Sequence, residues 1–231
     1  DLIQYPVGNT RNTYTIPNSV KTIGDYAFYK STSLTEIIVD AGNTNYSSDD
    51  KGVLFNKNQT DLIQYPVGNT RNTYTIPNLV TIIGDYAFYR CPSLTEVTIG
   101  NSVETIGIYA FTICTSLTEV TIPNSVETIG GRAFYHCDSL TEVTIGNSVE
   151  TIGSSAFRFC TSLTEVTIPD SVKTIEYFAF ANCTSVTEVT IPNSVKTIGD
   201  EAFVFCTSVT EIIVDAENTN YSSDDKGVLF N

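Results

Sequence analysis

The feature that most constrains this chain is a 23-residue repeat. Phenylalanine recurs at that interval from Phe88 to Phe203, and cysteine recurs at the same interval from Cys91 to Cys206. One unit, LTEVTIPNSVETIGGRAFYHCDS, occupies residues 117–139, and its neighbours differ from it at few positions. Self-similarity at a fixed period of this length indicates a solenoid, in which each unit packs only against its neighbours.

A short strand is predicted at the start of each unit, where Leu117, Val120 and Ile122 follow the pattern L-x-x-V-x-I. Pro123 ends this strand because proline cannot donate to a sheet ladder. Apolar residues then recur every three to four positions at Val126, Ile129, Ala133, Phe134 and Cys137. That spacing predicts a short helical or 3₁₀ turn around Ala133 and Phe134.

A longer duplication overlies the short repeat. The segment DLIQYPVGNTRNTYTIPN at Asp1 recurs at Asp61, and NTNYSSDDKGVLFN at Asn43 recurs at Asn218. The shift from Asp1 to Asp61 equals one 23-residue unit plus a 37-residue insertion. Two apolar runs in the insertion flank the polar residues 57–60, which predicts a β-hairpin.

We therefore expect residues 1–231 to form a single repeat array with no separate domains. Its parts are a first repeat region (1–39), a hairpin-containing insertion (40–76), regular 23-residue repeats (77–214) and the truncated start of a second hairpin insertion (215–231). One unit alone buries too little apolar surface to offset the entropy of ordering its backbone. The units are therefore expected to fold only by stacking on one another.

The motif S-V-x-x-I-G followed by A-F-x-x-C resembles the BspA-like leucine-rich repeats of surface proteins from bacteria and some protozoa. In one unit the motif comprises Ser125–Val126, Ile129–Gly130, Ala133–Phe134 and Cys137. The resemblance implies an α/β solenoid, a right-handed leucine-rich-repeat superhelix with a parallel concave β-sheet and short helical or 3₁₀ turns on the convex side. It also implies an extracellular or cell-surface location and adhesion to host proteins such as fibronectin and fibrinogen.

Three positions depart from the repeat pattern. Ser125 stands where a general leucine-rich repeat carries its asparagine ladder, which marks the subclass. Glu176 replaces the glycine of the I-G pair, and Ser31 replaces the cysteine of the first unit. These last two changes indicate that single rungs tolerate variation.

The charge of the chain excludes some classes of partner. With 12 Lys and Arg, a net charge of −14 and a pI near 4.3, the chain opposes a phosphate backbone or an anionic lipid surface. Nucleic acid is therefore not an expected partner. No apolar stretch reaches the roughly 18 residues needed to cross a bilayer, so direct membrane insertion is not expected. The chain contains no Met, and we interpret it as a piece of a longer product whose targeting signals lie elsewhere.

The six cysteines, one per unit, indicate a packing column of buried free thiols rather than a metal-ligand cluster. Disulfides between stacked cysteines remain an alternative at this stage, because neighbouring rungs place them close together. His136 is the only histidine, so neither a zinc site nor a histidine relay is expected around it. We expect no metal and no cofactor.

The recurring motif Thr-Glu-x-Thr defines a first set of candidate binding residues. These side chains are expected on the concave face, at Glu96, Glu119, Glu142, Glu165, Glu188, Glu211, Thr98, Thr121, Thr144, Thr167 and Thr190. Adjacent strands lie about 4.8 Å apart, where two like charges repel by about 1 kcal/mol in water. The glutamates therefore form either a simple solvated face or a surface that attracts a basic segment or loosely held cations.

A second set of candidates lies in the pairs that flank Ala-Phe, where the units differ from one another. A partner that recognises a particular sequence is expected on the convex or lateral side, near Phe159, Tyr177, Phe178 and Phe205. Large aromatic side chains are typical anchors of protein interfaces.

We predict a non-catalytic cell-surface or secreted binding module that adheres to host or matrix proteins through the solenoid surface. The alternative is a structural spacer within a larger surface protein. A carboxylate-based hydrolase is a distant third, because glycosidases need only two acids. Each strand glutamate has an identical copy one rung away, whereas a catalytic pair needs two carboxylates in unequal surroundings.

Self-association is a further expectation. Residues 227–231 form the first strand of a hairpin, and the sequence of its second strand stands at residues 1–6. These two segments are therefore expected to pair between copies of this piece, head to tail. In the longer product both positions would be internal, so the contact belongs to the piece.

Overall fold

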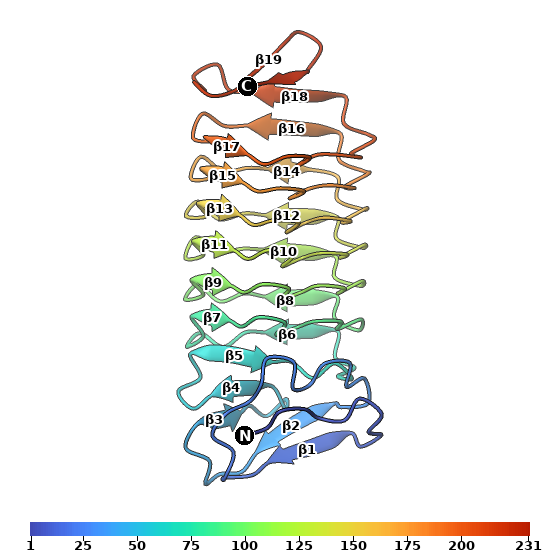
Figure 1. The fold of residues 1–231 in the computed structure, drawn as a ribbon, viewed down its shortest axis with the longest axis vertical. Helices are drawn as coiled ribbons and strands as arrows, with labels where there is room; N and C mark the ends of the chain where they lie inside the picture. The colour runs from blue at the N-terminus through green and yellow to red at the C-terminus, as the bar shows by residue number, and fades with distance from the viewer.

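The computed structural model describes all 231 residues as a column of stacked rungs built from strands and turns. Figure 1 shows the N-terminus near one end of the column and the C-terminus at the other. Each unit crosses the column twice, because it contains one strand on each of two faces. The structure contains no α-helix and no 3₁₀-helix, so the fold is a β-solenoid.

Parallel strands in three short sheets make the first face. They are β1 (Thr13–Ile16), β2 (Glu36–Val39), β6 (Thr73–Thr75), β8 (Glu96–Thr98), β10 (Glu119–Thr121), β12 (Glu142–Thr144), β14 (Val166–Thr167), β16 (Glu188–Ile191) and β18 (Glu211–Val214). The sheets follow the orders β1-β2, β12-β10-β8-β6 and β14-β16-β18. Equal repeat length keeps these strands in register, so that Glu119 pairs with Glu96 on one side and Glu142 on the other.

A nine-stranded sheet makes the second face. It contains β3 (Tyr46–Ser48), β4 (Leu54–Asn56), β5 (Asp61–Gln64), β7 (Ile82–Ile83), β9 (Thr105–Ile106), β11 (Thr128–Ile129), β13 (Thr151–Ile152), β15 (Thr174–Ile175) and β17 (Thr197–Ile198). The predicted hairpin is present, because β4 and β5 pair antiparallel around residues 57–60. Strand β5 then pairs parallel with β7, so the insertion extends this sheet.

The last two strands, β19 (Ser222–Ser223) and β20 (Leu229–Phe230), pair antiparallel as β3 and β4 do. At the other end of the chain, Leu2 bridges Ile23 in the way that Leu62 pairs with Ile83. Both ends therefore reproduce parts of the internal insertion, as the duplicated sequence predicts.

The prediction of short helical or 3₁₀ turns is wrong. A 3₁₀-helix requires each N–H to donate to the carbonyl three residues back. In the unit 117–139, Ala133 and Tyr135 donate in this way, but Arg132 and Phe134 donate to carbonyls of the following unit at 2.8 Å. The segment is a run of β-turns whose alternate N–H groups join the rungs. We call this segment, residues 130–137 and its equivalents in other units, the turn edge.

From Tyr86 onward, the turn edge of each unit also holds two non-glycine residues in the left-handed region of φ. In the unit 117–139 these are Arg132, with φ of 56°, and His136, with φ of 57°. This conformation costs an L-residue roughly 1–2 kcal/mol. At these two positions the following unit supplies acceptors for the N–H groups, which helps to offset this cost.

The core is a set of columns that run along the solenoid. Phenylalanine rings from Phe88 to Phe203 stack with centroids 4.7–5.6 Å apart and interplanar angles of 12° or less. A cluster of 48 buried residues includes the rings from Phe88 to Phe180, and the partly buried Phe203 packs against it. A smaller cluster of nine fills the N-terminal region. Because each ring packs on its copy, the units are stable only together.

Exchange of an exposed turn-edge residue tests the left-handed conformation. Glu201 is exposed, has φ of 57° and makes no side-chain hydrogen bond. We expect Glu201→Asn to exceed Glu201→Val in free energy of unfolding by about 1 kcal/mol, because asparagine tolerates positive φ and a β-branched residue does not. Urea unfolding curves measure the difference. The control position is the exposed Glu127, which precedes β11. There the Asn variant should be no more stable than the Val variant, because β-branched residues favour strands. The same order at both positions would contradict this explanation.

Candidate functional site

The predicted glutamates and threonines of the Thr-Glu-x-Thr motif all point outward, because strand side chains alternate between core and solvent. In β10, for example, Glu119 and Thr121 are exposed while Val120 between them is buried. We call this surface, formed by the outward residues of β8, β10, β12, β14, β16 and β18, the Glu face.

A groove of about 950 Å³ runs along four rungs of the Glu face. It brings together Glu96, Glu119, Glu142, Glu165, Thr98, Thr121, Thr144 and Thr167. The remaining candidates, Glu188, Glu211 and Thr190, continue the same columns on β16 and β18 but do not line the groove. Asn101, Asn124 and Asn147 line one side of it. The groove is therefore long, polar and repetitive.

The glutamates of the groove have nearly identical surroundings. No ion pair in the structure involves them, and all are exposed to solvent. One local contact differs, since Thr167 Oγ1 donates to Glu165 Oε1 at 3.3 Å. A carboxylate pair for acid–base catalysis needs one member in a drier environment than the other. The groove offers no such difference, so its geometry gives no support to a hydrolase.

Three of the four predicted turn-edge aromatics lie together in one cluster. The guanidinium of Arg158 lies 4.9 Å from the ring centroid of Phe159 and 4.5 Å from that of Phe178. Tyr177, which is 51% exposed, packs on Phe178 with centroids 4.1 Å apart. Arginine thus bridges two rungs by stacking on both rings.

The cluster extends to the preceding unit. His136 stacks on Phe159 at 4.4 Å, and Tyr135 meets the same ring edge-on at 5.6 Å. His136 Nδ1 lies 3.1 Å from Asp138 Oδ1. We call Tyr135, His136, Arg158, Phe159, Tyr177 and Phe178 the aromatic patch.

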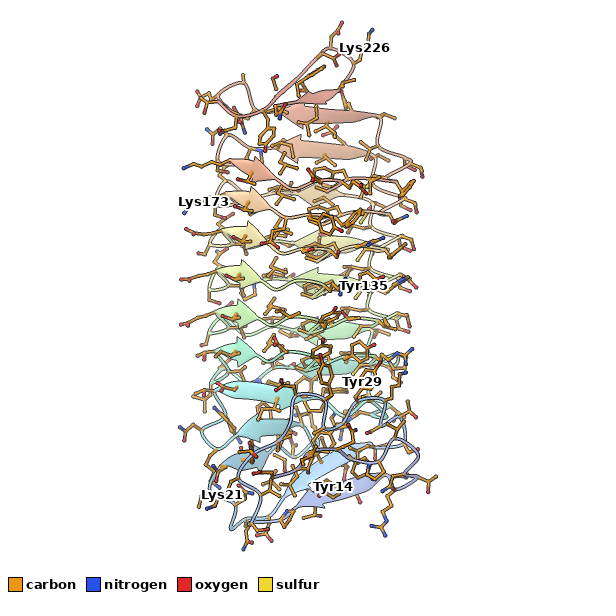
Figure 2. All side chains as sticks on the ribbon, in the orientation of Figure 1. Tyr14, Lys21, Tyr29, Tyr135, Lys173 and Lys226 are labelled. Carbon is orange, nitrogen blue, oxygen red and sulfur yellow. The ribbon has the colours of Figure 1, made fainter.

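Phe205 does not join the aromatic patch. It is 65% exposed and occupies the same repeat position as Phe159, but Asn182 stands between them in the column. The roles of Arg158, Tyr135 and His136 were missed from the sequence, although all three fall in or beside the variable pairs. Figure 2 shows Tyr29 and Tyr135 on the same side of the column and Lys173 on the opposite side.

The cysteine column lies inside the solenoid, and all six thiols are free. Each thiol from Cys114 to Cys206 donates to the carbonyl of the phenylalanine one unit earlier, as Cys137 Sγ does to Phe111 at 3.2 Å. Burial raises the pKa of Cys91, Cys137 and Cys160 well above the ordinary value, and that of Cys183 is raised for the same reason. The thiolate, which is the nucleophile and metal ligand, is therefore disfavoured.

No group of three or more His, Cys, Asp or Glu side chains is placed to hold a metal ion. The structure also contains no helix with the length and apolar character needed to cross a bilayer.

Parallel rungs, each one repeat unit long, around stacked phenylalanine and cysteine columns define a leucine-rich-repeat solenoid. The chain belongs to the family described as BspA type leucine-rich repeat region, which matches in six copies over residues 9–66, 68–150 and 127–224. Proteins of this family are typically non-catalytic binding proteins. Comparison with curated protein sequences gave no match.

Solved structures support the same assignment. A leucine-rich repeat protein from Eubacterium ventriosum is 30% identical over 95% of this chain, with a TM-score of 0.75. A leucine-rich cell surface protein from Faecalibacterium prausnitzii is 28% identical over 92%, with a TM-score of 0.65. The pneumococcal vaccine antigen PcpA is 27% identical over 94%, with a TM-score of 0.60. This chain covers 63%, 50% and 47% of these three proteins, respectively.

The buried thiols generate a prediction about alkaline stability. The unfolded chain loses thiol protons above pH of about 8.5, whereas the folded chain, with raised thiol pKa values, retains them. The free energy of unfolding should therefore fall as pH rises, with a slope that approaches about 1.4 kcal/mol per pH unit for each such thiol once the pH exceeds the unfolded thiol pKa. Urea unfolding between pH 8 and about 9.5 measures the slope, below most tyrosine titration.

The matched variant for this prediction is Cys137→Ala. It should be less stable than the parent across this pH range, because the substitution leaves a cavity. Its free energy of unfolding should nevertheless fall less steeply with pH, because one thiol fewer loses its proton on unfolding. Equal slopes for variant and parent would show that the buried thiol does not contribute.

Proposed function

We propose that this chain is the non-catalytic binding region of a cell-surface or secreted protein that adheres to host or matrix proteins. Family membership supports a binding role, and a relative from Faecalibacterium prausnitzii is described as a cell surface protein. The family resemblance makes fibronectin and fibrinogen the first partners to test. The contact surface that we propose is the aromatic patch.

The observation that carries this choice is the stacking of Arg158 between Phe159 and Phe178, with the exposed ring of Tyr177 beside them. Tyrosine and arginine are enriched among the residues that dominate protein-binding energies. Stacking also fixes the side chains before a partner arrives, which lowers the entropy lost on binding.

The aromatic patch is also the more selective surface. The Glu face presents the same side chains on successive rungs, so a partner gains little by binding one register rather than the next. The patch combines side chains that occur together at one height of the column, because the variable pairs of neighbouring units differ. It therefore offers a single defined docking position.

We assign the Glu face a supporting role, in which it attracts a basic segment of the partner. Its groove is lined by four glutamates and contains no lysine or arginine, and the chain as a whole carries a charge of −14. Such an attraction acts over distances near the Debye length and weakens with salt.

Binding to immobilised fibronectin and fibrinogen tests the proposal by surface plasmon resonance. Alanine at Arg158 or Tyr177 should weaken binding by about tenfold or more, as expected for central interface residues. The matched control is Ile108→Ala, since Ile108 occupies the repeat position of Tyr177 and is 48% exposed. Unchanged affinity in Arg158→Ala and Tyr177→Ala would reject the aromatic patch. Absence of binding to any matrix protein would favour the structural spacer instead.

Salt dependence tests the Glu face in the same assay. Raising the ionic strength from about 0.05 to about 0.5 M should weaken binding by the parent chain. The double variant Glu119→Gln and Glu142→Gln keeps the shape of the groove and removes two charges, so its affinity should respond less to salt. Affinity that is independent of salt would remove the supporting role and leave this surface as a solvated face.

Head-to-tail pairing is the second interaction that we propose for this chain. Within the molecule, Phe55 of β4 pairs with Leu62 of β5, and the same register would join Phe230 to Leu2 of a second copy. Ile3 is 80% exposed and Phe230 is 48% exposed, so both apolar side chains are accessible. A contact of this type propagates, because its two surfaces differ.

Sedimentation velocity of the 231-residue chain tests this pairing. Association should increase with protein concentration, and deletion of residues 226–231 should abolish it by removing β20. Phe230→Lys should have the same effect, because charge on an edge strand opposes pairing. An association state that does not change in either variant would refute the contact.

A further inference from the structure

A cavity of about 290 Å³ lies where the duplicated halves of the N-terminal region meet. Two segments, residues 23–29 and residues 82–89, line it together with β5 and Val67. The two segments are related by the longer duplication, and both belong to turn edges. No predicted binding residue belongs to this cavity.

The cavity exists because the rung between these turn edges is shorter than a regular one. Tyr65 of this rung stacks on Phe88 with centroids 5.2 Å apart, so the rung keeps its place in the core. The chain then turns inward, and the N–H of Gly68 donates to the carbonyl of Leu34. The rung therefore omits a turn edge, and the adjacent turn edges enclose the space that it leaves.

Four tyrosines close the outer side of this space. Tyr26 Oη and Tyr86 Oη are hydrogen-bonded at 2.8 Å, and the rings of Tyr29 and Tyr89 stack with centroids 5.4 Å apart. Within each segment the two tyrosine rings meet edge-on, with centroids 6.1 Å apart for Tyr26 and Tyr29 and 5.7 Å apart for Tyr86 and Tyr89. Aliphatic side chains of Ile23, Ile63, Ile82 and Val67 contribute to the rest of the lining.

The charged groups of the lining are all anionic. Its charged side chains are Asp25, Asp61 and Asp85, and no Lys, Arg or His lines the cavity. Gln64 Nε2 already donates to the carbonyls of Tyr65 and Ala87, which leaves its oxygen as an acceptor. The tyrosine hydroxyls can both donate and accept, so it is the charge of the lining that discriminates between ligands. Three carboxylates without a cationic side chain disfavour an anion and favour a cation.

The duplicated aspartates differ in a way that also favours a cationic ligand. Asp85 Oδ1 accepts the N–H of Ile108 from the next unit at 2.7 Å. Asp25 is its equivalent, but the short rung that follows offers no corresponding N–H, and no hydrogen bond or ion pair to Asp25 is present. The carboxylate at the cavity mouth thus retains its capacity to bind a positive group.

We propose that this cavity binds an alkylammonium group, whose hydrocarbon body packs against the tyrosine and isoleucine side chains while its ammonium head meets Asp25. Aromatic rings and a carboxylate together favour a cation with an apolar body over either feature alone. The volume lies near the lower limit for small-molecule pockets, about 300 Å³, which suits a short chain. A lysine side chain of a partner and a free amine share this chemistry.

Calorimetric titration with n-butylammonium chloride tests the site, with 1-butanol as the neutral ligand of similar shape. Butylammonium should bind saturably and about tenfold more tightly than butanol. Asp25→Asn should reduce the affinity for butylammonium by about tenfold, because it removes the unpaired charge. The matched control is Asp200→Asn, at the same repeat position in a unit with no such cavity, and it should bind as the parent does.

A second titration distinguishes the sources of the group. N-acetyl-lysine amide carries the same ammonium, whereas its ε-acetylated form does not. Binding of the lysine compound alone would assign the site to a protein side chain, and binding of both amines would extend it to free amines. The proposal would be overturned if neither amine binds saturably, if butanol binds as tightly as the amine, or if Asp25→Asn leaves the affinity for the amine unchanged. Circular dichroism of each variant confirms that the column is folded.

Discussion

The contact between one rung and its copy is the interaction on which the whole structure depends. Each phenylalanine packs on the equivalent phenylalanine of the next unit, and alternate N–H groups of the turn edge donate to that unit. These contacts stabilise a left-handed backbone at residues such as Arg132, which would otherwise be strained. A unit removed from the column would lose its core and half of the hydrogen bonds of its turn edge together.

This dependence on stacking restricts where selective binding can arise. Residues of the core and of both sheets must resemble their copies, because a change in size or register would propagate to two neighbours. The outward glutamates share the register and therefore repeat as well. The pairs that flank Ala-Phe vary in size and chemistry, since their side chains leave the column at its edge. The aromatic patch forms there because Arg158 reaches rings on two rungs.

Much of this architecture could be predicted from the sequence, because the repeat itself records the stacking. The period located the strands of the first face, the buried columns and the outward glutamates, and the apolar runs around residues 57–60 located the hairpin. The second strand of each unit, such as β11, was not predicted. The turn edge could not be predicted in the same way. An apolar spacing of three to four residues fits a 3₁₀ turn as well as a run of β-turns. The two structures differ in whether alternate N–H groups donate within the unit or to the following unit, and the spacing does not record this. The position of Arg158 between Phe159 and Phe178 likewise depends on how two edges are aligned.

The insertion shows how a repetitive column acquires an enclosed space. A rung that followed the repeat would fill its own layer, as Phe111 and the turn edge around it do. The rung that contains Tyr65 preserves the aromatic column but leaves the edge layer empty, so the column continues while a cavity remains beside it. Because this rung has no turn edge, Asp25 has no counterpart of the Ile108 N–H that donates to Asp85. The shortened rung thus produces both the cavity and the unpaired carboxylate of Asp25. Both lie where a rung without a turn edge stands between two rungs that have one.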